Sequence, residues 1–177
     1  MRVIAGTHGG RELIAPKGRA TRPTSDRVRE ALFSILGDIH DLRVLDLFAG
    51  SGALAIEALS RGAGPATLVD SAGAAVAAIK RNLDSLGAQA EVVRQPASRF
   101  LQAALRDGRQ YDLVFLDPPY RHASTLGREL TSALMPILAA DARVVAESDR
   151  RSPLSLGMVL LDERRYGDTL IQIHAAR

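Results

Sequence analysis

The sequence contains no cysteine and no tryptophan. The lack of cysteine excludes disulfides, thiolate metal sites and a cysteine nucleophile from this chain. Aromatic residues make up only 4%, so any base-stacking surface depends on three Tyr and four Phe. The four His share no metal-ligand spacing, and we expect no metal. No apolar run approaches the ~20 residues of a membrane span and no signal-peptide pattern opens the chain, which predicts a cytoplasmic protein with no membrane contact.

The basic residues are concentrated at the front of the chain. Residues 1–29 hold seven Lys or Arg and two acids, a net +5, whereas the whole chain of 177 residues is only +3. A basic front end on a near-neutral body indicates a polyanionic partner such as nucleic acid, although a solvated charged arm gives the same pattern.

The pattern of turns and apolar residues predicts two regions, 1–23 and 24–177. Residues 1–16 read as a β-hairpin with Gly6, Gly9 and Gly10 at its turn, and a basic linker follows to residue 23. A helix is predicted over 24–37, capped by Thr24 or Ser25. Because the catalytic pattern begins only near residue 43, we expect the sheet to close its core without the hairpin.

From residue 43 onward, strands and helices alternate. The predicted strands are 44–48, 66–69, 91–93, 111–116 and 143–147, and the predicted helices are 53–60, 74–86, 98–106 and 125–134. Such alternation indicates an α/β fold with a doubly wound, mostly parallel sheet. The C-terminal part of the chain departs from this alternation. The strand-like runs 158–161 and 169–173 flank a turn and predict an antiparallel hairpin.

A glycine loop joins the first predicted strand to its helix. Gly50 and Gly52 allow a tight turn and the close approach of a ligand, and Asp70 ends the next strand, where a carboxylate can hold ribose hydroxyls. Asp46 starts the loop, where an acid disfavours a diphosphate and favours an amine or cation. We therefore prefer S-adenosylmethionine to a dinucleotide as the ligand.

A second motif, DPPY at 117–120, follows the strand 111–116. Prolines remove backbone donors, so that the Pro118 carbonyl and the acceptor-only Asp117 can face a ligand, and Tyr120 offers a flat ring to a base. This set fits an exocyclic amine, because a carboxylate and a carbonyl can accept its hydrogens and orient its nitrogen.

These motifs together resemble S-adenosylmethionine-dependent amino-methyltransferases. Three further runs, RVIAG from residue 2, RPTSDRVREALF from residue 22 and RYGDT from residue 165, resemble the RsmD-type family of bacterial 16S ribosomal RNA (guanine-966)-N2 methyltransferases. The likeness runs from residue 1 to about residue 174. It implies a Rossmann-like class I methyltransferase that acts, as a monomer, on 16S rRNA within the small ribosomal subunit or an assembly intermediate.

The resemblance also implies roles for single residues. Asp46 lies near the methionine amino end and Asp70 holds the ribose. The other implied cofactor contacts are Phe48, Gly50 and Gly52 in the loop and Arg22, Thr24 and Arg27 from the N-terminal region. Asp117 and the Pro118 carbonyl hold the target amine, with Tyr120 stacked on the guanine. The implied RNA contacts are Arg2, Arg11, Lys17 and Arg19.

Three alternatives remain open on the sequence. DNA adenine-N6 or cytosine-N4 methyltransferases share the DPPY motif, but they usually carry a separate recognition region, and only about forty residues precede the sheet here. A dinucleotide-dependent oxidoreductase leaves residues 117–120 unexplained. A non-catalytic RNA-binding module leaves the glycine loop and Asp70 unexplained.

Overall fold

The computed structural model describes residues 1–16, 25–118 and 123–176. Its helices are α1 (Asp26–Leu36), α2 (Ala53–Ser60), α3 (Gly73–Leu86), α4 (Ala97–Arg106) and α5 (Ala123–Leu134), with a 3₁₀ turn, η1 (Met135–Ile137). Its strands are β1 (Val44–Asp46), β2 (Ala66–Asp70), β3 (Glu91–Arg94), β4 (Tyr111–Leu116), β5 (Leu138–Asp149), β6 (Val159–Tyr166) and β7 (Thr169–Ala175). No helix of the described residues is long and apolar enough to cross a membrane.

The strands form one seven-stranded sheet in the order β3-β2-β1-β4-β5-β7-β6. The five strands from β1 to β5 run parallel, and β7 is antiparallel to both β5 and β6. The chain builds outward from β1 in one direction through β2 and β3, then crosses to β4 and continues in the other direction. This is the expected doubly wound α/β sheet with a C-terminal antiparallel hairpin, and that prediction is confirmed.

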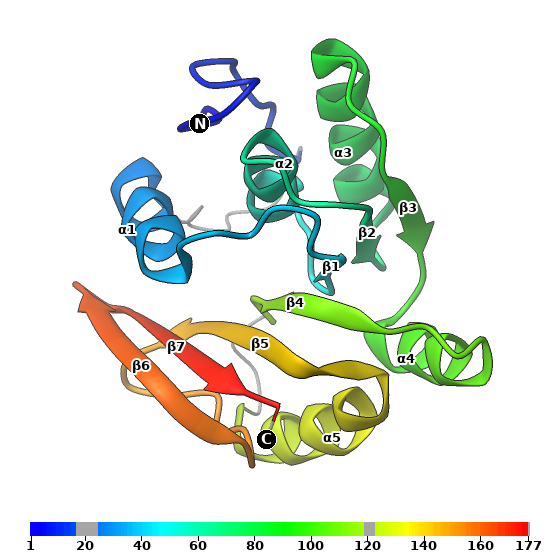
Figure 1. Cartoon of the computed structure of the whole chain (residues 1–177), viewed down its shortest axis with the longest axis vertical. Coiled ribbons are helices and arrows are strands. Elements are labelled where there is room, and N and C mark those ends of the chain that lie inside the picture. The colour runs from blue at the N-terminus through cyan, green and yellow to red at the C-terminus, as the bar shows by residue number, and fades with distance from the viewer. Residues whose placement is uncertain (17–24, 119–122, 177) are drawn as a thin grey trace.

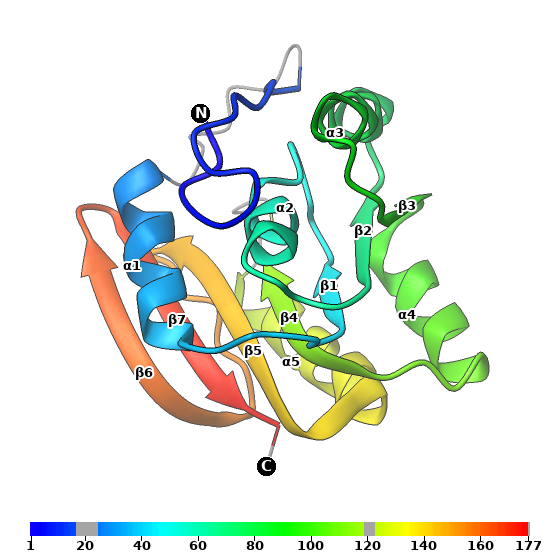
Figure 2. The ribbon, with the colours of Figure 1, turned by 45° about the horizontal axis from the view of Figure 1, so that its top comes forward.

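Helices cover both faces of the sheet (Figures 1 and 2). On one face, Val44, Leu68 and Phe115 pack in a core with apolar residues of α1, α2 and α3. On the other face, Leu45 and Val114 belong to a second core with residues of α4 and α5. The alternation of neighbouring residues between the two cores follows from the two-residue period of a strand and explains why these strands are apolar throughout.

Residues 1–16, here called the N-terminal arm, lie across the outside of α2 near the end of α3 (Figure 2). The expected hairpin forms as a short one, with an antiparallel bridge between Arg2 and Glu12 and three backbone hydrogen bonds between its limbs: Val3 N–H to the Arg11 carbonyl oxygen, Gly10 N–H to the Val3 carbonyl oxygen, and Leu13 N–H to the Met1 carbonyl oxygen. Val3 and Leu13 are almost fully buried and belong to the same core as α1, α2 and α3. The expectation that the sheet closes its core without these residues is therefore wrong, because the arm supplies part of that core.

Candidate active site

Three acidic residues lie at the carboxyl edge of the parallel strands. Asp46 is the last residue of β1, Asp70 is the last residue of β2, and Asp117 directly follows β4. Since β1 pairs with β2 on one side and β4 on the other, these three strand ends are neighbours. The order of the strands reverses between β1 and β4, and this switch point is where open α/β sheets bind ligands.

Asp46 is buried, with 2% of its surface exposed, and its carboxylate accepts hydrogen bonds from the backbone N–H groups of Phe48 and Ala55. The Ala55 bond also satisfies a free N–H in the first turn of α2. Burial raises the pKa of Asp46 from its ordinary 3.8 to about 7, the two backbone bonds lower it, and the nearby negative charge of Asp70 raises it further. A cation placed beside this carboxyl would favour its ionised form.

Asp70 is also buried and supports the glycine loop. One carboxylate oxygen accepts a hydrogen bond from the Gly50 N–H at 3.0 Å, and the other accepts from the Ala72 N–H at 2.8 Å. The structure thus gives Asp70 a local role in addition to the ribose contact that the sequence predicts. A carboxylate can take both roles, because its two oxygens offer about four acceptor positions.

The two loop glycines have positive φ angles for different reasons. Gly50 has φ +56°, and a Cβ built on it would approach nothing closer than the Phe48 carbonyl oxygen at 4.0 Å. Gly52 has φ +81°, and a Cβ there would lie 2.9 Å from Leu68 Cδ2. Gly52 is therefore required by the packing of the loop on β2, whereas the outer face of Gly50 is open to a ligand.

These features fit the methionine and ribose parts of S-adenosylmethionine. Two neighbouring buried carboxyls repel each other at the sheet edge, so a cationic group such as an α-ammonium or a sulfonium is the complementary ligand. The open face of Gly50 lets a ligand approach the backbone of the loop. A diphosphate, in contrast, would add negative charge beside both carboxyls. Within the described residues, no group of three metal-ligating side chains is found.

The second motif is described only in part. Asp117 is half-buried at the end of β4, and Pro118 is buried beside it. Pro118 has no N–H, so its backbone offers only an acceptor. Tyr120 lies outside the described residues, as do Lys17, Arg19, Arg22 and Thr24. The predicted roles of these five residues remain predictions.

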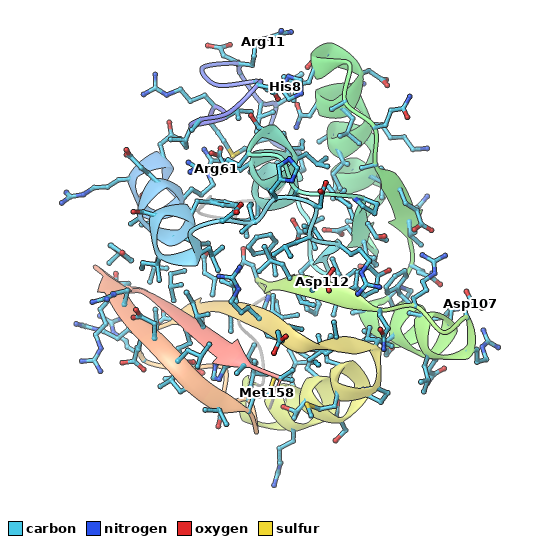
Figure 3. The ribbon with its side chains drawn as sticks, viewed as in Figure 1. His8, Arg11, Arg61, Asp107, Asp112 and Met158 are labelled. Carbon is cyan, nitrogen blue, oxygen red and sulfur yellow. The ribbon has the colours of Figure 1, made fainter. Side chains whose placement is uncertain are left out.

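The other predicted basic residues are exposed, on the arm and on α1. Arg11 reaches α3, where its guanidinium donates to the Ser85 carbonyl oxygen at 2.6 Å (Figure 3). Arg2 pairs with Asp26 at 3.3 Å, and Arg27 is exposed in the first turn of α1. Among the described residues, no hydrogen bond or ion pair joins Arg2, Arg11 or Arg27 to the glycine loop.

Sequence reasoning missed the role of four buried polar residues, Arg29, Glu57, Ser60 and Asn82, which join the arm to α1, α2 and α3. Glu57 of α2 accepts hydrogen bonds from the N–H groups of Ile4, at 2.6 Å, and Ala5, at 3.1 Å. Asn82 of α3 bonds to Ile14 and to Ser51 of the glycine loop. The available signal was the helical period, because each stands where the surrounding helix face is apolar.

Comparison with known proteins identifies the family. A family model described as "Conserved hypothetical protein 95" matches residues 1–175. The chain belongs to this family. It is 40% identical over 183 residues, covering 100% of both chains, to "Putative rRNA methyltransferase YlbH" of Bacillus subtilis. It is 37% identical over 175 residues, covering 94% of this chain and 89% of the relative, to "Ribosomal RNA small subunit methyltransferase D" of Haemophilus influenzae.

Solved structures agree with this family membership. "Putative methyltransferase yhhF from Escherichia coli" superposes with a TM-score of 0.84 at 37% identity, covering 99% of this chain and 97% of that one. A more distant structure, "SMU.776, a putative methyltransferase complexed with SAH", shares the fold at 19% identity with a TM-score of 0.71, covering 85% of this chain and 49% of that one. The resemblance to RsmD-type methyltransferases and the Rossmann-like fold that it implied are confirmed.

Proposed function

We propose that this family member transfers a methyl group from S-adenosylmethionine to the exocyclic N2 amine of a guanine in 16S rRNA of the small ribosomal subunit. The observation that carries the proposal is the meeting of Asp46, Asp70 and Asp117 at the switch point of the sheet. Relatives named as ribosomal RNA methyltransferases support the class of reaction and of substrate. The guanine N2 position comes from the sequence resemblance and needs its own test.

The first two acids serve the cofactor in this proposal. Asp46 faces the ammonium end of the methionine part, and Asp70 holds the ribose while it keeps Gly50 in place. Phe48, Gly50 and Gly52 form the loop along which the ligand lies, and Arg22, Thr24 and Arg27 close the pocket. Bound there, S-adenosylmethionine supplies an electrophilic methyl group.

Asp117 and Pro118 serve the target base. A guanine N2 amine is a poor nucleophile because its lone pair is delocalised into the ring. The Asp117 carboxylate and the Pro118 carbonyl oxygen accept hydrogen bonds from its two N–H groups, which raises electron density on nitrogen and fixes its direction, and the carboxylate takes the one proton that nitrogen releases when it gains the methyl group. Tyr120 stacks on the base. Positioning and electrostatics then provide most of the rate, with no covalent enzyme intermediate.

We propose that the region 1–23 grips the RNA backbone through Arg2, Arg11, Lys17 and Arg19, with the region 24–177 as the methyltransferase domain. An RNA-recognition region this small suits an RNA that is recognised by its folded shape, as in a ribosomal subunit. Because the substrate is ribosomal, we place the enzyme in the cytoplasm, and we propose that it acts as a monomer, which light scattering of the purified protein can check.

The experiment that tests the function measures transfer of a tritiated methyl group. The acceptors are protein-free 16S rRNA, partly assembled small subunits, mature small subunits and DNA, followed by digestion to nucleosides. We expect label in N2-methylguanosine from a ribosomal acceptor. Label in N6-methyladenine or N4-methylcytosine of DNA would instead support the DNA methyltransferase alternative, and stabilisation by NAD but not by S-adenosylhomocysteine would support an oxidoreductase.

The RNA contacts are tested by salt dependence. Arg2→Ala and Arg11→Ala should each weaken binding to the small subunit and reduce the salt slope by about one phosphate contact. Arg106→Ala, an exposed change at the end of α4, is the matched control and should leave the slope unchanged. Equal slopes for all three variants would remove these residues from the RNA interface.

A further inference from the structure

Asn82 is a polar residue at a core position of α3. Its neighbours on the same helix face are Ala75, Ile79 and Leu86, all buried, and Asn82 itself is only 1% exposed. A buried amide needs hydrogen-bond partners, because an unpaired one costs about 1–3 kcal/mol in a protein interior. An apolar residue would serve the packing of α3 better, so the amide calls for another explanation.

The partners of Asn82 come from two segments far apart in the chain. Its Oδ1 accepts a hydrogen bond from the Ile14 N–H at 2.8 Å, and its Nδ2 donates to the Ile14 carbonyl oxygen at 3.0 Å. The same Nδ2 donates its second hydrogen to the carbonyl oxygen of Ser51 at 2.9 Å. Both amide hydrogens and the oxygen are thus used, and only Asn or Gln offers one acceptor and two donors in this form.

The two segments are the two binding elements of the proposed function. Ser51 lies between Gly50 and Gly52 in the loop assigned to the cofactor. Ile14 lies in the N-terminal arm, assigned to the RNA, and its side chain is 53% exposed. The bond from Asn82 to Ile14 is therefore not explained by apolar packing of that side chain. It fixes the backbone of the arm relative to the loop.

A second link ties the other half of the arm to the helix that follows the loop. Glu57 of α2 is fully buried, and its carboxylate binds the N–H groups of Ile4 and Ala5 and the Arg61 Nε at 2.7 Å. Arg61 in turn lies over the Phe33 ring of α1, 4.9 Å from its centre, in the space between α1 and α2 (Figure 3). Both halves of the arm are thus held by groups on elements adjoining the cofactor loop.

We propose that Asn82 is a positioning residue that couples cofactor binding at the glycine loop to RNA binding by the N-terminal arm. The proposal rests on the proposed function, since it takes its two ligands from there. A ligand that restrains the Ser51 backbone also restrains Asn82 and, through it, the Ile14 backbone, and this restraint adds to the contacts that already hold the arm in place before RNA binds. By thermodynamic reciprocity, RNA raises the affinity for the cofactor by the same factor.

The test measures binding of small ribosomal subunits to the full-length protein with and without saturating S-adenosylhomocysteine. For the wild type we expect the ligand to tighten binding by at least about fivefold, the lower end of ordinary coupling. In Asn82→Ala the ratio should fall to near one. In Asn82→Asp the acceptor for Ile14 N–H remains while both donors are lost, so the Ser51 link is broken and the ratio should fall as well.

Two controls separate positioning from stability. Asp84→Asn changes an exposed residue of the same helix and should keep the wild-type ratio. A thermal melt of each variant confirms that it is folded at the assay temperature. If Asn82→Ala melts lower but keeps the wild-type ratio, Asn82 is only structural and the proposal is overturned.

The wild type alone also tests the idea, whatever the variants do. If the wild type binds both ligands but S-adenosylhomocysteine does not change its affinity for the small subunit, the coupling is overturned and the proposed function still stands. Failure to bind the small subunit at all overturns the proposed function and the coupling together.

Discussion

One carboxylate oxygen of Asp70 accepts the backbone N–H of Gly50 at 3.0 Å. This bond joins the end of β2 to the loop that follows β1, so the residue predicted to hold the ribose also shapes the loop that we propose as the cofactor site. The two roles predict different results from one substitution, because a structural bond affects every ligand of the loop and a ribose contact affects only ligands with the hydroxyls.

Asp70→Asn should separate these roles. The amide oxygen of Asn can still accept from the Gly50 N–H, but its NH₂ group would face the other donors, the Ala72 N–H and the ribose hydroxyls. We therefore expect affinity for S-adenosylhomocysteine to fall about tenfold or more. An analogue without the ribose 2′-hydroxyl should lose much less. Calorimetric titration of both ligands into wild type and variant measures this. Equal losses for the two ligands would restrict Asp70 to holding Gly50.

The raised pKa of Asp46 predicts that cofactor affinity depends on pH. Without ligand this carboxyl is half-protonated near pH 7, and a neighbouring ammonium group favours the ionised form, so binding releases a proton. Affinity for S-adenosylhomocysteine should therefore rise from pH 6 to pH 8, by at most about tenfold per pH unit. Asp46→Asn should bind more weakly and lose this slope. A slope that persists in the Asn variant would assign the proton to another group.

The raised pKa of Asp46 also predicts how the stability of the folded protein depends on pH. Between the ordinary pKa of 3.8 and about 7, the folded protein holds a proton on Asp46 that the unfolded chain has lost. The contribution of this group to the free energy of unfolding therefore falls as pH rises through that window. Asp46→Asn removes this contribution. The melting temperature of the variant minus that of wild type should therefore increase from pH 5 to pH 8. A constant difference across this range would contradict the raised pKa.

Gly50 offers a test of the cofactor loop with a close control. Gly50→Ala and Gly108→Ala both place a Cβ on a backbone with positive φ, +56° and +63°, and in neither case does that Cβ clash. Each should cost about 1–2 kcal/mol of stability from the left-handed conformation alone. Only Gly50→Ala should weaken S-adenosylhomocysteine binding, because its methyl group fills the open face of the loop. Equal binding by the two variants would place the ligand elsewhere.

Much of the fold follows from local patterns. Helix α2 has the predicted bounds, and α1 is capped by Ser25 Oγ, which accepts from Val28 N–H at 3.3 Å. Strand β5 is longer than predicted, Leu138–Asp149 rather than 143–147, because pairing to β4 and β7 extends it over residues without an apolar pattern. The first predicted strand, 44–48, ends at Asp46, because the glycine turn starts there.

The links between distant segments were beyond the sequence. A motif shows that Asp46, Asp70 and Asp117 end strands, and the doubly wound rule brings strand ends together, so the site could be predicted. Nothing local shows that Glu57 and Asn82 would meet the arm, since their partners are backbone groups, and backbone groups look alike at every position. The same limit explains the wrong expectation that the arm is dispensable for the core.

Asp117→Asn tests the chemistry of the proposed transfer. Guanine presents its N1–H and N2–H as adjacent donors that a carboxylate can accept together, whereas an amide accepts one and opposes the other with its own NH₂. Turnover on the ribosomal acceptor should fall at least about tenfold, roughly 1.4 kcal/mol of transition-state stabilisation. Affinity for S-adenosylhomocysteine should stay within a few-fold of wild type, because the proposed function assigns Asp117 to the target base and not to the cofactor. The control is Asp141→Asn, an exposed change on β5 just before Arg143, where pairing with β4 resumes. It should leave turnover and S-adenosylhomocysteine affinity unchanged. Wild-type turnover in Asp117→Asn would show that the negative charge is dispensable, and orientation by Pro118 and Tyr120 would then have to account for the rate.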